Sequence, residues 1–179
     1  MRIFVSINLL PEIKKYLEEV GSGFVVARAT PAKSSHLTLK FLGEVSDEKM
    51  PEIKEKLGRI NFKKFRIELT EAGFFTDRNG HIRVIWVGLT SPPELMQLQK
   101  EIEDAVSKYG AVKTENFIPH LTLSRVKYAN DKDLSRQIKN AKIKKLEMEV
   151  EHFSLMQSQL SPTGPIYTEL EKFGDGGSF

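Results

Sequence analysis

The tetrapeptide His-Leu-Thr-Leu occurs twice in the chain, at residues 36–39 and again at residues 120–123. The protein contains 4 histidines, so half of them stand in identical local sequence. An identical copy built on a rare residue is poorly explained by chance and indicates a repeated functional motif. A histidine can gain or lose a proton near neutral pH, and a threonine hydroxyl can donate a hydrogen bond to a phosphate oxygen. The two tetrads together predict acid–base chemistry.

Alternation within each tetrad predicts a strand that is buried on one face. On such a strand the histidine and the threonine point to one side, while the two leucines point into the core. If the two strands face each other across a cleft, two imidazoles and two hydroxyls converge on one volume. One histidine would then remove a proton from the attacking group and the other would protonate the leaving group. The hydroxyls would stabilise charge on phosphate oxygens in an in-line displacement at phosphorus.

The elements around the tetrads follow the same order twice: strand, helix, tetrad strand, helix, strand. Hydrophobic periodicity and turn residues predict hairpins across 76–80 and 161–165, strands at 2–9, 64–75, 81–89 and 142–157, and helices at 11–20, 48–60, 92–110 and 131–140. We therefore predict an α+β fold of two lobes, made by duplication of a half-motif, with two antiparallel or mixed sheets flanking a central cleft on a pseudo-two-fold axis. A single bilobal domain should span 1–173, with halves of about 1–75 and 81–157, a closing strand at 165–173 and a flexible tail at 174–179.

Composition narrows the classes of function. The 179 residues are 40% hydrophobic, which is enough for a sizeable core, and the absence of cysteine excludes disulfides, thiolate nucleophiles and cysteine zinc sites. The net charge of +3 favours anionic partners only weakly, because 27 basic residues stand among 24 acidic ones. We find no signal peptide and no membrane span, and we expect a cytoplasmic protein that does not bind membranes.

Three stretches resemble a known family: "HLTLKFLGE", "FIPHLTLSR" and "LMQSQLSPTGPIYTEL". They are similar to the bacterial and archaeal RNA 2′,3′-cyclic phosphodiesterases, also called 2′-5′ RNA ligases, of the two-histidine (2H) phosphoesterase superfamily. The resemblance covers nearly the whole chain. It implies an enzyme without metal or cofactor that opens a terminal 2′,3′-cyclic phosphate of RNA to a 2′-phosphate. It also implies reversible 2′-5′ joining of tRNA halves, and we expect a monomer.

The resemblance also implies residue roles. His36 would be the general acid and His120 the general base, although the opposite assignment stays open. Thr38, Thr122 and Arg125 would bind the substrate, the last as a cation for the phosphate.

Arg125 conflicts with strict alternation, which would turn its side chain to the leucine face of the strand. Either a bulge re-aims the side chain or Arg125 acts from the rim of the site. Lys40, which is in phase with His36, is an alternative basic contact.

The other candidates are weaker. His81 and His152 have no matching partner and are expected at the surface or in packing. A base could stack on an aromatic ring, although we expect Phe41 in the core; the candidates are Phe41, Trp86, Phe117 and Tyr167. The lysines of residues 139–145 could steer RNA or form an ordinary solvated face.

Other classes of function fit less well. Neither the HExxH pattern of metal hydrolases nor the GxSxG pattern of serine hydrolases is present. The remaining alternative is a non-catalytic RNA- or nucleotide-binding module on the same fold. Intact histidine and threonine in both tetrads favour the enzyme.

Overall fold

The computed structural model describes residues 1–25, 28–32, 35–110, 116–162 and 164–174, so the predicted tail beyond Gly174 lies outside the described residues. Within these ranges the chain forms an α+β fold, as predicted. The strands are β1 (Arg2–Asn8), β2 (Arg28–Pro31), β3 (His36–Glu44), β4 (Phe65–Thr76), β5 (Ile82–Leu89), β6 (His120–Tyr128), β7 (Glu147–Val150), β8 (His152–Ser161) and β9 (Gly164–Gly174). The helices are α1 (Pro11–Ser22), α2 (Met50–Gly58), α3 (Pro93–Val106) and α4 (Asp131–Asn140), and short 3-10 turns lie at η1 (Asp47–Lys49) and η2 (Ser107–Tyr109).

The strands form one antiparallel sheet in the order β7-β4-β5-β6-β3-β1-β8-β9, with β2 added on β6. Its two parts meet between β3 and β6 through the pair Leu37 and Leu121, both fully buried. The two predicted sheets are therefore two wings of one sheet. We call β3, β1, β8 and β9 the His36 wing, and β6, β5, β4, β7 and β2 the His120 wing. The order from the centre outward is what a duplicated half-motif would produce, and the duplication itself stays a prediction.

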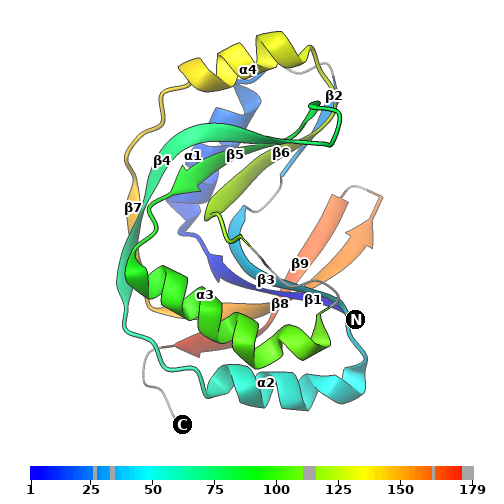
Figure 1. Ribbon diagram of the computed structural model, residues 1–179, viewed down its shortest axis with the longest axis vertical. Coiled ribbons are helices and arrows are strands. Elements are labelled where there is room, and N and C mark those ends of the chain that lie inside the picture. Colours follow the sequence, from blue (N-terminus) through cyan, green and yellow to red (C-terminus); the bar gives the residue numbers. More distant parts are fainter. Residues whose placement is uncertain (26–27, 33–34, 111–115, 163, 175–179) are drawn as a thin grey trace.

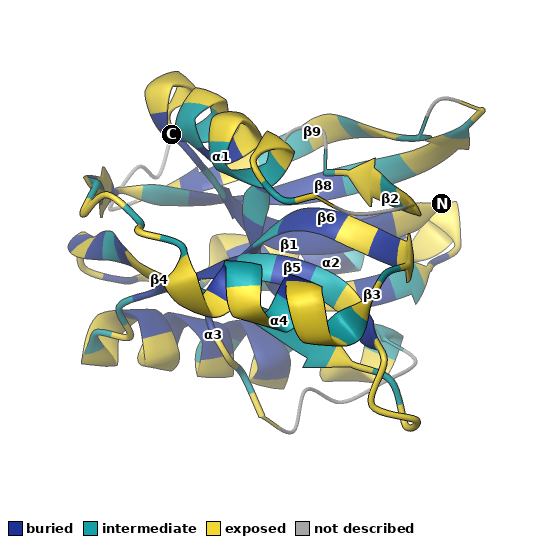
Figure 2. Cartoon of the chain, turned by 90° about the horizontal axis from the view of Figure 1, so that it is seen from above, coloured by how far each residue is buried: buried dark blue, intermediate teal, exposed yellow. Residues whose placement is uncertain are grey.

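The helices α1 and α3 exchange places between the wings (Figure 1). α1 follows β1 in the chain but packs against β6 and β2, while α3 follows β5 but packs against β3. α2 lies beside α3 and α4 covers β4 and β5. Figure 2 shows that the strands between these helices are largely buried, whereas the outer faces of the helices are exposed. Each wing therefore combines elements from both predicted sequence halves.

Two local predictions need correction. The single strand predicted across 142–157 is two strands, β7 and β8, which belong to different wings because β7 pairs with β4 while β8 pairs with β1 and β9. The short strand β2 was not predicted, because its four residues include Pro31 and show no apolar alternation. Both predicted hairpins are confirmed, as β4–β5 and β8–β9. In the first, Gly80 takes a positive φ of 82°, which glycine adopts without strain.

Candidate active site

Both tetrad strands bulge at the last leucine of the tetrad. On β3, Thr38 pairs with Ser6 and Lys40 pairs with Val5, which leaves Leu39 as the extra residue. On β6 the same irregularity falls at Leu123, between the pairs of Thr122 with Trp86 and of Ser124 with Ile85. A bulge shifts the alternation by one residue, so later side chains exchange faces. The two strands consequently show the same burial pattern through their first seven residues.

The bulge on β6 settles the position of Arg125. Its side chain is exposed and lines the same cavity as His120 and Thr122. Of the two alternatives, the bulge that re-aims the side chain is the one present. Strict alternation failed here because it cannot anticipate an extra residue.

The bulge on β3 overturns two predictions for the same reason. Lys40 is turned into the interior, where its side chain is 1% exposed and its Nζ lies 2.9 Å from Glu103 Oε1 on α3. It is therefore a buried ion-pair partner and not a contact for the substrate. Phe41 is turned out of the core, is 46% exposed and lines the cavity.

The cavity lies between the two wings and has a volume of about 200 Å³. This exceeds the roughly 10–15 Å³ that a single water needs, so a larger group such as a phosphate can enter. All five predicted site residues line it, and so do residues from β2 and from the β8–β9 hairpin. The lining residues are Thr30, Pro31, Ala32, Ser35, His36, Thr38, Phe41, His120, Thr122, Arg125, Gly164, Pro165 and Tyr167.

The pair of Leu37 with Leu121 sets the register between the tetrads. In this register His36 lies across from Thr122, and the histidine of β6 lies across from the threonine of β3. In regular antiparallel geometry such facing residues have Cβ atoms about 4.5–5.5 Å apart and diagonal neighbours are roughly 7–8 Å apart. The two histidines are diagonal neighbours in this register, and both line the cavity, so both face the space in which a phosphate would bind.

His120 is held by its backbone and by aromatic rings. Its Nδ1 lies 2.7 Å from the carbonyl oxygen of Ile118. A carbonyl only accepts, so Nδ1 carries the hydrogen and Nε2 keeps its lone pair when the ring is neutral. Phe75 meets the ring edge-on at 4.9 Å between centroids, and Trp86 lies at 6.3 Å. Burial, with a smaller effect of the Arg125 charge, lowers the pKa of His120 against the opposing effect of the Ile118 carbonyl. His120 is therefore suited to act as a base.

His36 has different neighbours. Phe4 stacks on its ring at 4.7 Å between centroids, and Tyr167 meets the ring edge-on at 4.9 Å. Asn8, across from His36 on β1, donates through Nδ2 to Glu169 Oε2 at 2.9 Å. The same carboxylate oxygen accepts from the hydroxyl of Ser154 at 2.7 Å. Aromatic rings therefore contact both histidines, and a polar cluster with an acidic acceptor begins at Asn8, the residue across from His36.

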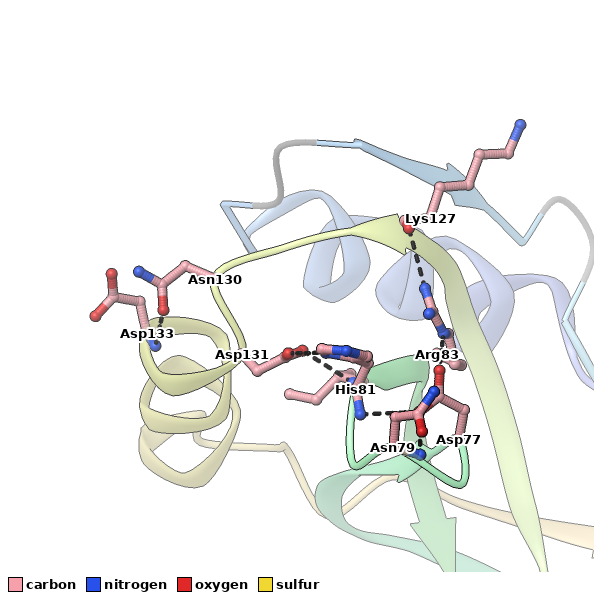
Figure 3. Close-up of polar contacts among 9 residues, drawn as sticks. Asp77, Asn79, His81, Arg83, Lys127, Asn130, Asp131 and Asp133 are labelled. Atoms are coloured by element: carbon pink, nitrogen blue, oxygen red, sulfur yellow. Dashed lines mark hydrogen bonds and ion pairs between the residues drawn. The ribbon is translucent and has the colours of Figure 1, made fainter.

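The remaining histidines lie apart from the cavity. His81 is exposed immediately before β5, and its Nδ1 lies 2.8 Å from Asp131 Oδ2 at the beginning of α4 (Figure 3). His152 begins β8 and is partly buried. Phe117 packs against the core.

Ser35 escaped the sequence-based prediction, as did the lining residues of β2 and of the β8–β9 hairpin before Tyr167. Ser35 donates a hydrogen bond to the carbonyl of Thr122 at 2.9 Å and so fastens the start of β3 to β6. Its only signal was its place directly before the first tetrad.

Two negative findings concern the described part of the chain. There, no three histidine, aspartate or glutamate side chains are grouped so that they could hold a metal ion. No helix in the same ranges is long and apolar enough to cross a membrane.

Comparison with known proteins agrees with this architecture. The RNA 2′,3′-cyclic phosphodiesterase of Archaeoglobus fulgidus is 36% identical over 179 residues, covering 97% of this chain and 99% of the relative. The protein of the same name from Thermotoga maritima is 37% identical over 177 residues, covering 95% and 93%. Among solved structures, TT0787 of Thermus thermophilus matches with a TM-score of 0.79 and 28% identity over 100% of both chains. LigT of Escherichia coli complexed with 3'-AMP matches with a TM-score of 0.75 and 28% identity over 97% of both chains.

The model of the 2'-5' RNA ligase superfamily matches residues 26–162, a span that contains both tetrads and both bulges. The resemblance noted in the three sequence stretches is thereby confirmed. By this match and by the identity to its relatives, the chain belongs to the 2′-5′ RNA ligase superfamily.

Proposed function

We propose that the protein is an RNA 2′,3′-cyclic phosphodiesterase that opens a terminal 2′,3′-cyclic phosphate to a 2′-phosphate. The observation that carries this proposal is the convergence of both His-x-Thr pairs and Arg125 on one cavity. The names of the relatives from Archaeoglobus fulgidus and Thermotoga maritima support the substrate class.

In the proposed reaction, water attacks phosphorus in line with the bond from phosphorus to the 3′ oxygen. His120 takes a proton from the water at Nε2, the nitrogen left open by the hydrogen bond of Nδ1 to Ile118. The bond to the 3′ oxygen breaks, and His36 gives that oxygen a proton. The products are a 2′-phosphate and a free 3′-hydroxyl, and exchange with solvent restores both histidines.

Charge on the phosphate oxygens is balanced by the remaining predicted residues. Thr38 and Thr122 would each donate a hydrogen bond to a non-bridging oxygen, and Arg125 would add a positive charge. These groups supply proton transfer and charge stabilisation together, so the mechanism requires neither a metal nor an organic cofactor. Phe41 and Tyr167, which also line the cavity, would contact the sugar and base of the terminal nucleotide.

The same groups can also join RNA ends reversibly by using a different nucleophile. If the 5′-hydroxyl of a second RNA replaces water, attack on the cyclic phosphate forms a 2′-5′ linkage, and tRNA halves are the substrates we propose for this step. A monomer suffices, because one chain supplies both histidines. A chain without cysteine is compatible with the reducing cytoplasm, where we place the enzyme.

Turnover of a nucleoside 2′,3′-cyclic phosphate in the presence of EDTA tests this proposal. We expect sustained hydrolysis, with the product identified as the 2′-phosphate by phosphorus NMR. Absence of turnover would contradict the proposed activity and would favour the alternative, a non-catalytic nucleotide-binding module. Activity that EDTA abolishes and zinc restores would contradict the metal-free mechanism, and a 3′-phosphate product would mean that the other ester bond breaks.

A further inference from the structure

The face of β6 that carries His120, Thr122 and Arg125 toward the cavity, here called the cavity face, continues beyond Arg125. Arg125 pairs with Thr30 on β2, and both line the cavity. Residues two apart on a strand share a face, so Arg28 lies on the same face as Thr30. The cavity face of the His120 wing therefore extends outward along β2 and β6 to Arg28.

A second bulge on β6 places two more side chains on this face. Ala29 pairs with Val126 and Arg28 pairs with Tyr128, so Lys127 is an extra residue on β6. In a bulge two residues oppose one partner residue, and here both of them, Lys127 and Tyr128, are exposed. At the first bulge of β6 two consecutive residues likewise share one environment: Leu123 and Ser124 are both buried, on the opposite face of the strand.

Tyr128 is the most exposed large aromatic residue among those described, with 71% of its surface accessible. It stands between two cations, Arg28 across the strand pair and Lys127 beside it. Among the described residues neither cation takes part in an ion pair, whereas Arg83 nearby is bound by Asp77 at 2.7 Å. Figure 3 shows the side chain of Lys127 projecting away from that Asp77–Arg83 cluster.

We propose that Tyr128, Arg28 and Lys127 form a second nucleotide site that binds the RNA residue preceding the cyclic end. An aromatic face accepts any unpaired base, and flanking cations follow the phosphate backbone of a single strand. The site lies about two strand residues, roughly 7 Å, beyond the pair of Arg125 and Thr30. This is within reach of a neighbouring nucleotide when the terminal phosphate occupies the cavity.

The inference rests on the proposed function, because the cavity must hold the RNA end for Tyr128 to meet the preceding base. It adds a reason why the enzyme would prefer RNA to a free cyclic nucleotide. A mononucleotide fills the cavity alone, whereas an oligonucleotide also uses the second site.

The test compares two substrates in the full-length protein: a nucleoside 2′,3′-cyclic phosphate and a tetraribonucleotide that ends in a 2′,3′-cyclic phosphate. Tyr128→Ala should leave kcat and KM for the mononucleotide unchanged and raise KM for the tetranucleotide about tenfold, within the range of base–aromatic stacking. Tyr128→Phe keeps the ring and should behave as the natural protein does. Equal losses on both substrates, or no loss on either, would overturn the proposal.

A binding measurement separates this inference from the proposed reaction. Fluorescence anisotropy with a labelled tetraribonucleotide ending in a 2′-phosphate requires no turnover. Arg28→Ala and Lys127→Ala should each reduce the slope of log Kd against log salt by about 0.7, the value for one lost single-strand phosphate contact. Lys63→Ala, which removes an exposed lysine between α2 and β4, is the matched control and should leave the slope unchanged. If the slopes of all three variants equal that of the natural protein, the site does not exist, whether or not the enzyme turns over.

Discussion

The strands β3 and β6 share a tetrad and a bulge but differ in the residues that follow. β3 continues with Lys40 and Phe41, and β6 continues with Ser124 and Arg125. On both strands the first of these residues is buried and the second is exposed. The backbone bulge is therefore the same on both strands, while the exposed position after it holds the aromatic ring of Phe41 on one wing and the cation of Arg125 on the other. The same backbone geometry therefore presents different side chains to the cavity, because one position differs between the two strands.

Aromatic rings contact both histidines, but the other neighbours of the two rings differ. Trp86 and Phe75 lie behind His120, and Gly73 leaves the room that the indole occupies, since a Cβ at that position would overlap the ring of Trp86. His36 is stacked on Phe4, and the carboxylate of Glu169 accepts a hydrogen bond from Asn8, the residue across from His36 on β1. Two histidines in unequal surroundings are what separate acid and base roles require.

The largest expected effects concern the histidines themselves. Substituting either His36 or His120 by alanine should lower kcat/KM by about 10²–10⁴-fold with the fold retained by circular dichroism. The double substitution should cost much less than the product of the single effects if the pair acts as a unit.

A substrate whose leaving oxygen needs no proton distinguishes the two roles. It should restore activity to His36→Ala and not to His120→Ala. Restoration of His120→Ala alone would exchange the roles, and full activity of either variant on the natural cyclic phosphate would refute the two-histidine mechanism.

The buried ion pair on the His36 wing has no counterpart at Ser124. Lys40→Met leaves the carboxylate of Glu103 buried without its partner, so the free energy of unfolding should fall by about 3–5 kcal/mol in chemical denaturation. Replacing both residues, as Lys40→Met with Glu103→Leu, should restore much of that loss. Lys108→Met, which breaks a surface ion pair with Glu52, serves as control and should change stability little. A Lys40→Met variant as stable as the natural protein would show that the pair does not hold the β3 bulge.

Substitutions of Arg125 and Phe41, the exposed residues after the two bulges, should affect different kinetic constants. Arg125→Ala should reduce kcat by about 10²–10³-fold, because it removes a donor to charge that develops in the transition state. Phe41→Ala should raise KM with little change in kcat, since stacking is equal in ground and transition states. Steady-state kinetics on a nucleoside 2′,3′-cyclic phosphate measure both effects. If both variants lost kcat equally, the two strands would not have divided these tasks.

The smallest expected effect is a shift along the pH axis. The base must be neutral to act, and the lowered pKa of His120 keeps it neutral to a pH below its ordinary value of about 6.5. The acidic limb of kcat/KM should therefore lie below that pH. Arg125→Ala removes a charge that lowers this pKa, so the pKa should rise and the limb should move to higher pH. NMR titration of the His120 ring measures the shift independently of activity, and a limb unmoved in Arg125→Ala would contradict the electrostatic contribution.

Periodicity and the repeated tetrad predicted the α+β class, both hairpins and four of the side chains that line the cavity, those of the two histidines and two threonines. Arg125 was predicted from the family resemblance, against strict alternation. The faces of Lys40 and Phe41 were not predictable, because a bulge adds one residue to a strand without an obvious mark in its letters. The separation of β7 from β8 likewise depends on which strand each one pairs with. Ser35 and the residues of β2 reach the site through tertiary position alone, which no local pattern records.

The exchange of helices between wings has a consequence for synthesis of the chain. β1 emerges first but pairs with β8, which lies near the end, and α1 packs against β6 from the second half. Contacts between such distant residues are slow to form, because long loops must close before the contacts contribute stability. The first 75 residues can pair β1 with β3, but they should not complete their packing on the ribosome until most of the second half has emerged, so their remaining apolar faces are exposed to aggregation during translation.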